Sequence, residues 1–173
     1  MTAPADVVRV HATGLSRGLL EAGGVIWPCA LGRSGLTALK REGDGATPRG
    51  SFALGPVYYR PDRVLPPRTA LDAVPIDPDL GWCDDAASFA YNRPVRLPFS
   101  GSHERMWRED GLYDFVVVFG HNTAPPRRPF GSAIFLHLAR PGFLPTEGCV
   151  ALRRQDILKL MPRLGPQTRL MVG

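Results

Sequence analysis

One histidine and one cysteine in the C-terminal half of the chain have the types and spacing needed for nucleophilic chemistry. His137 lies in the apolar run of residues 134–138, where an imidazole has little reason to be unless it has a partner. Cys149 follows 12 positions later, directly after Gly148. Acyl transfer through a thioester requires a nucleophile, a base and oxyanion donors, and a Gly-Cys pair with a histidine can supply all three. The alternative is that both residues are simply buried, since free cysteine is often a small core hydrophobe.

The composition fits one domain, residues 1–173, that is long enough to bury a sizeable hydrophobic core. With 19 glycines and 18 prolines, the chain favours many turns and short strands over a helical bundle. The formal net charge of +5 favours an anionic partner, such as an acidic cell-wall polymer, nucleic acid or a membrane surface. The basic residues are scattered, however, so the sequence predicts no nucleic-acid-binding module.

Neither a metal, a cofactor nor a membrane span is expected. The histidines and cysteines lack the spacing that is typical of metal sites. Cys29, Cys83 and Cys149 leave at least one thiol free, and the sequence leaves open whether Cys29 and Cys83 form a disulfide. No apolar run approaches the ~20 residues of a membrane-spanning helix. Residues 1–6 contain no basic segment followed by an apolar one, so no secretory signal is visible and a cytoplasmic location stays open.

The elements that must position the candidate pair are predicted to be mainly β, with one late helix. Continuous apolar character makes residues 114–120 a strand that is buried on both faces. Residues 153–161 are expected to form an amphipathic helix on the sheet, because apolar residues recur at helical spacing from Ile157 to Leu164. Residues 15–22 are predicted as a turn or a loose helix, and residues 102–108 as a short helix. Further strands are expected at residues 7–11, 24–31, 51–59, 133–138 and 168–172.

The irregular stretch of residues 60–112 has two interpretations. Its prolines, aspartates and aromatic residues fit a loop that faces a substrate. They equally fit a surface excursion that Trp82 and Trp107 fold onto the sheet.

Candidates for substrate binding follow from position. His121 and Asn122 come at the end of the most apolar strand, where it passes into a loop rich in proline and arginine. Tyr113 and Trp82 are further candidates, although each also fits a packing role.

Two motifs resemble the YkuD-type L,D-transpeptidase catalytic domain. Its signature is a strand histidine followed by Ser/Thr-x-Gly-Cys-Ile/Val, which His137 and residues 146–150 (Thr-Glu-Gly-Cys-Val) meet. The Gly-Asp-Gly-x-Thr-Pro-x-Gly-x-Phe stretch that opens a strand in such domains is present as residues 43–52. Two matches in the right order are more specific than either one alone. The resemblance implies a YkuD-like β-sandwich that is an enzyme.

By this resemblance the substrate is a peptidoglycan stem peptide and Cys149 is the nucleophile. His137 takes the thiol proton, giving a thiolate–imidazolium pair, and the Leu138 carbonyl orients the imidazole. Backbone N–H groups of Gly148 and Cys149 hold the oxyanion, and Thr146 joins the substrate-binding candidates. The resemblance also implies covalent inhibition by carbapenems and a location in the periplasm or cell wall.

Two residues depart from the family pattern. Ala151 stands where family members usually carry an arginine, and Arg153 or Arg154 is available to replace it. Glu147 stands where a basic or small residue is common, and a carboxylate near the thiol opposes thiolate formation. Three functions therefore stay open: transpeptidation, hydrolysis by a cysteine hydrolase (L,D-carboxypeptidase, endopeptidase or amidase), and a non-catalytic wall-binding module.

Overall fold

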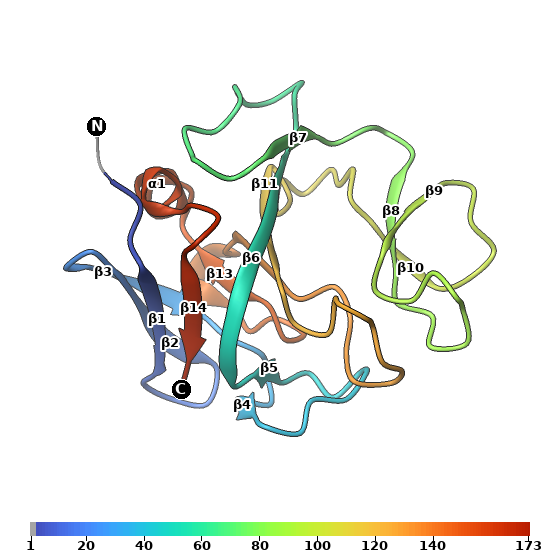
Figure 1. Cartoon of the computed structure of the whole chain (residues 1–173), viewed down its shortest axis with the longest axis horizontal. Helices are drawn as coiled ribbons and strands as arrows, with labels where there is room; N and C mark the ends of the chain where they lie inside the picture. Colours follow the sequence, from blue (N-terminus) through green and yellow to red (C-terminus); the bar gives the residue numbers. More distant parts are fainter. Residues whose placement is uncertain (1–2) are drawn as a thin grey trace.

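The computed structural model describes residues 3–173, which form short strands and a single α-helix, α1 (Arg154–Leu160) (Figure 1). Two 3₁₀ turns, η1 (Pro141–Phe143) and η2 (Met161–Arg163), lie in the C-terminal part of the chain, before β13 and after α1. The strands in chain order are β1 (Val7–Ala12), β2 (Arg17–Ala22), β3 (Val25–Ala30), β4 (Leu36–Thr37), β5 (Thr47–Pro48), β6 (Gly50–Tyr59), β7 (Ala73–Pro75), β8 (Leu80–Cys83), β9 (Pro94–Arg96), β10 (His103–Arg105), β11 (Phe115–Phe119), β12 (Phe135–Leu138), β13 (Val150–Leu152) and β14 (Arg169–Val172).

The largest sheet closes on itself. Its strands follow the order β11-β12-β13-β3-β2-β1-β14-β6, and an additional pairing of β6 with β11 joins the two ends. β6 can hold both neighbours because it is long: residues 50–53 pair with β14 and residues 54–59 pair with β11. β7 adds alongside β6. This arrangement confirms the mainly β, sandwich-like fold that was predicted.

The main hydrophobic core lies on the inner face of this sheet, where alternate residues of each strand meet. The predicted amphipathic helix is confirmed: the four apolar side chains at helical spacing are all buried in this core, and each contributes roughly 1.5–3 kcal/mol by leaving water. They are Ile157, Leu160, Met161 and Leu164.

A second apolar cluster covers the outer face of β11 and β12. Val116, Val118 and Phe135 point outward, and the excursion of residues 60–112 packs over them through the buried Trp82. Both faces of β11 are therefore buried, as its continuous apolar sequence predicted. In Figure 1, α1 and the three-stranded sheet β10-β8-β9 lie on opposite sides of β6 and β11. The excursion thus folds onto the sheet, as one of its two interpretations expected.

The prediction of a turn or loose helix at residues 15–22 was wrong. The segment from Arg17 forms β2, the second strand of a hairpin with β1, which a Thr13 N–H bond to the Arg17 carbonyl closes at 2.9 Å. Glycine is required at position 18 of this strand, because a Cβ there would lie 2.7 Å from the His11 carbonyl oxygen.

The prediction of a short helix at residues 102–108 was also wrong. His103 and Glu104 pair with Cys83 and Trp82 across the β10–β8 ladder, an interaction between distant segments that local periodicity cannot reveal. All three cysteines of the chain lie within the described residues 3–173 and are free, so Cys29 and Cys83 are not disulfide-bonded. Over the same range no helix is long and apolar enough to cross a membrane.

Candidate active site

The register between β12 and β13 brings the two candidate residues to the same face of the sheet. These parallel strands pair Leu136 with Val150 and His137 with Ala151. Because side chains alternate along a strand, His137 shares the outer face with Ala151 and with Cys149, two positions before it. His137 and Cys149 line the same cleft, whose volume is about 180 Å³.

The imidazole of His137 is oriented by backbone. Its Nδ1 lies 2.9 Å from the Leu138 carbonyl oxygen, which can only accept, so Nδ1 carries the proton and Nε2 is left with a lone pair. The Tyr113 ring meets the imidazole edge-on, with centroids 5.3 Å apart. Burial lowers the pKa of His137 to about 4, so the ring is neutral near pH 7.

The thiol of Cys149 is also neutral. Burial and the Glu104 carboxylate together raise the pKa of Cys149 to about 12, although the Phe135 amide opposes them by donating to the sulfur. The Sγ atom donates to the Ala133 carbonyl oxygen at 3.4 Å, and no hydrogen bond to His137 is present within residues 3–173. The thiolate–imidazolium pair expected from the sequence is therefore not the resting state, because burial disfavours both charges.

A tight turn presents Cys149 to the cleft. The Thr146 hydroxyl donates to the Cys149 carbonyl oxygen at 2.6 Å and accepts from the Gly148 N–H at 3.2 Å. Gly148 has φ +134°, a left-handed conformation that side-chain-bearing residues rarely adopt. The Cys149 N–H donates to no acceptor in the described chain, so it is available as an oxyanion donor.

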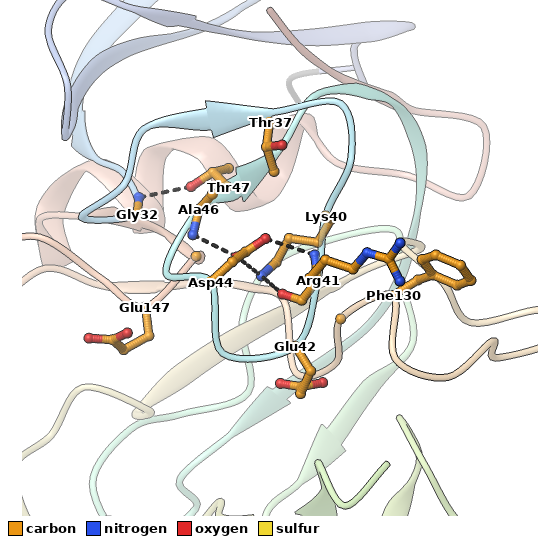
Figure 2. Close-up of polar contacts among 12 residues, drawn as sticks. Gly32, Thr37, Lys40, Arg41, Glu42, Asp44, Ala46, Thr47, Phe130 and Glu147 are labelled. Atoms are coloured by element: carbon orange, nitrogen blue, oxygen red, sulfur yellow. Dashed lines mark hydrogen bonds and ion pairs between the residues drawn. The ribbon is translucent and has the colours of Figure 1, made fainter.

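The motif of residues 43–52 opens as a loop built around Asp44. Figure 2 shows this carboxylate at the centre: one oxygen pairs with Lys40 and accepts from the Ala46 N–H at 2.9 Å, and the other accepts from the Arg41 N–H at 2.7 Å. The Thr47 hydroxyl, at the end of the loop, accepts from the Gly32 N–H at 2.8 Å. These bonds help to fix the backbone of the loop.

This loop meets the turn that carries the thiol. A Cβ on Gly148 would lie 2.8 Å from the Ala46 carbonyl oxygen and 3.3 Å from the Ile134 side chain. Only glycine allows such an approach. The two motifs noted in the sequence are therefore in direct contact, about a hundred residues apart in the chain.

The comparisons with known proteins agree with this geometry. The model of the YkuD family, the L,D-transpeptidase catalytic domain, matches residues 7–172. The chain belongs to the YkuD family. Searches of curated proteins and of solved structures found no significant match. As a YkuD domain, the protein falls in a family whose function is L,D-transpeptidation of peptidoglycan.

The two departures from the YkuD pattern have structural consequences. Glu147 points to Arg33, with Nε–Oε2 at 2.9 Å, so its charge is paired on the surface. The carboxylate that acts on the thiol is Glu104, which the sequence did not single out. Ala151 lies directly opposite His137 in the ladder and leaves space there.

Neither arginine considered as a replacement reaches the cleft of this YkuD domain. Arg153 lies over the Phe143 ring, 4.9 Å from its centroid, and Arg154 pairs with Asp114. Positive charge at the cleft comes instead from two other arginines. They are Arg108 and Arg140.

The predicted substrate residues of the YkuD domain fall into two groups. Tyr113 and Thr146 line the cleft. His121 lines a separate hollow beside the Asp44 loop, and Trp82 is buried behind Phe135. The amide of Asn122 bonds the backbone of its own loop, so these three do not reach the thiol and their substrate roles stay predictions.

Sequence reasoning missed a buried hub in this YkuD domain. The Asn92 amide nitrogen donates to the carbonyls of His121 and Asn122, and its oxygen accepts from the Trp82 indole and the Ala133 N–H. The carbonyl oxygen of Ala133 accepts the hydrogen bond that the Cys149 thiol donates. An asparagine before an arginine in an irregular stretch carries no local signal for such a role. No cluster of metal-binding side chains is found within residues 3–173.

Proposed function

We propose that this YkuD domain transfers the acyl group of a peptidoglycan stem peptide through a thioester on Cys149, with His137 as the general base. One observation carries the proposal: a cleft lined by both side chains, in which the Leu138 carbonyl fixes Nδ1–H and leaves Nε2 basic. A neutral imidazole beside a neutral thiol is competent for acylation, because the thiol proton can move to the imidazole as the sulfur attacks.

Attack begins when the thiol exchanges its Ala133 acceptor for Nε2 of His137. The sulfur then adds to the scissile carbonyl carbon as its proton passes to Nε2. Collapse of the tetrahedral intermediate breaks the C–N bond, and the imidazolium returns the proton to the leaving amine. An amine or water next attacks the thioester, the C–S bond breaks, and the proton returns to the sulfur.

Backbone amides stabilise the negative charge that develops on the carbonyl oxygen of the substrate. The unpaired N–H of Cys149 is the first donor. The N–H of Gly148 is the second, once its long 3.2 Å bond to the Thr146 hydroxyl yields to the stronger oxyanion acceptor. Such a donor typically contributes about 3 kcal/mol to transition-state stabilisation. The same thiol and amides would accept the strained carbonyl of a carbapenem and form a covalent adduct.

The test is formation of the covalent intermediate, followed by intact-mass measurement after mixing with a stem tetrapeptide or a carbapenem. Wild type should gain the acyl mass, and Cys149→Ala should gain none. Cys83→Ala is the matched control, since it removes another buried free thiol that lies outside the cleft. An adduct on the Cys149→Ala protein would rule out this residue as nucleophile.

Product analysis separates transfer from hydrolysis. A tetrapeptide that exchanges its terminal residue in the presence of an added D-amino acid identifies transpeptidation, whereas release of tripeptide alone identifies an L,D-carboxypeptidase. We infer that the protein acts where peptidoglycan stems are present, in the periplasm or cell wall. Fractionation of the tagged native protein tests this, and recovery in the cytoplasm alone would restrict the substrate to free wall fragments.

A further inference from the structure

A carboxylate in the active-site cleft has one side-chain hydrogen-bond partner and no ion pair within residues 3–173. Glu104 lies on β10, and the Tyr113 hydroxyl donates to its Oε2. Its Oε1 accepts no hydrogen bond, and no cation of residues 3–173 forms an ion pair with it. The Arg108 guanidinium lies over the Tyr113 ring and is already bound through two nitrogens to Asp110, at 3.0 and 2.6 Å.

The surroundings of Glu104 favour binding of a positively charged ligand group. Burial raises the pKa of Glu104; the Tyr113 hydroxyl and the Arg108 guanidinium oppose this, while the nearby carboxylates of Asp84 and Glu42 add to it. Asp84 Oδ1 is itself buried without a hydrogen-bond partner in the described chain. Buried negative charge is costly unless it is paired with a cation. An ammonium group that enters the cleft would meet this negative potential next to the sulfur of Cys149.

A free positive charge lies in the same cleft. Arg140 follows β12 by two residues and is exposed, and its guanidinium makes no hydrogen bond or ion pair with residues 3–173. A guanidinium is well suited to bind a carboxylate through two parallel hydrogen bonds. The cleft therefore offers one acceptor for an ammonium and one donor for a carboxylate, which is the charge pattern complementary to a free amino acid.

We propose that Glu104 and Arg140 form the subsite for the amine partner of the acyl transfer, with the ammonium of a free amino acid on Glu104 and its carboxylate on Arg140. This inference rests on the proposed function. The departing amino acid leaves from this subsite after the C–N bond breaks. An attacking amino acid binds there as the ammonium, loses one proton to solvent, and forms the new C–N bond as the C–S bond breaks and the sulfur regains a proton.

The subsite selects amines that carry a free carboxylate. The assay follows incorporation of isotopically labelled D-alanine or D-alaninamide into a stem tetrapeptide by mass spectrometry. Wild type should use D-alanine at a lower KM than D-alaninamide. Glu104→Gln should raise the KM for both amines roughly tenfold or more, because a charge-assisted bond is lost. Arg140→Gln should raise the KM for D-alanine alone and so remove the preference.

The matched controls remove the same kinds of charge from residues that lie outside the cleft. Glu109→Gln and Arg153→Gln alter a carboxylate and a guanidinium that do not line the cleft, and both should leave the KM values unchanged. Thermal unfolding shows whether the Glu104→Gln protein is still folded. Because Arg140 is exposed, Arg140→Gln tests the subsite even if Glu104→Gln is destabilised.

The outcomes separate this inference from the proposed function. If wild type forms the acyl-enzyme but Arg140→Gln keeps the preference and a folded Glu104→Gln keeps its KM values, the subsite is refuted and the thioester mechanism stands. If wild type forms no acyl-enzyme on Cys149, the proposed function itself fails, and the subsite fails with it.

Discussion

Replacement of Gly148 by alanine tests the contact between the two motifs. At φ +134° an L-residue costs roughly 1–3 kcal/mol in backbone strain. The new Cβ would also lie 2.8 Å from the Ala46 carbonyl oxygen, a backbone atom that cannot rotate away, and such overpacking costs roughly 1–3 kcal/mol more. The free energy of unfolding should therefore fall by roughly 2–6 kcal/mol.

Gly142→Ala is the matched control. Gly142 also has a positive φ, +72°, but a Cβ there meets nothing within 4 Å. This variant should lose only the left-handed strain, roughly 1–2 kcal/mol. The difference between the two variants isolates the clash with Ala46, and urea unfolding followed by tryptophan fluorescence measures it.

The same substitution should slow acylation of Cys149. Relief of the clash has to move either the thiol turn or the Asp44 loop, and a displacement of about 1 Å in a reacting group can cost roughly a hundredfold in rate. The rate of carbapenem adduct formation by intact mass provides the readout. If Gly148→Ala unfolds at the same urea concentration as Gly142→Ala and acylates at the wild-type rate, the close approach between the motifs does not exist.

Three further predictions follow from the same contacts. Asn92→Ala leaves up to four buried hydrogen-bonding groups without their partner, so urea unfolding should show a loss of at least about 2 kcal/mol, and a loss under 1 kcal/mol would contradict the hub. Thr146→Val removes both hydrogen bonds of the thiol turn and should lower the acylation rate more than the stability. Adduct kinetics and thermal unfolding measure the two effects, and acylation at the wild-type rate would contradict this prediction. The pKa of His137 is about 4 when folded and near 6.5 when unfolded, so its contribution to stability is complete above pH ~6.5 and is lost as pH falls towards 4, by up to about 3 kcal/mol. His137→Gln should flatten this part of the stability–pH curve, and an unchanged curve would show that the imidazole is not buried as a neutral base.

Patterns that depend on burial alone were predictable from the sequence. β11 is apolar on both faces because one face packs in the main core and the other beneath the excursion of residues 60–112, and its continuous apolar run indicates this directly. β2 and β10 were not predictable, because each becomes a strand through pairing with a partner. Local propensity is weak there, and tertiary context decides.

The same distinction applies to the site. His137 and Cys149 could be recognised by residue type and spacing, and both line one cleft. Glu104 reaches that cleft only because β10 pairs with β8, so no local signal marks it. The sequence also suggested Glu147 as the carboxylate that opposes the thiolate, since proximity in the chain does not reveal that Arg33 pairs with its charge.

The parallel pairing of β12 and β13 shapes how this YkuD domain can diversify. Parallel neighbours need a crossover, so residues 139–149 must travel back along the sheet before β13 can begin. That return path supplies much of one wall of the cleft, including Arg140 and Thr146. Insertions or exchanges in this single connection can therefore remodel the choice of acceptor, while the histidine at its start and the cysteine at its end keep their register.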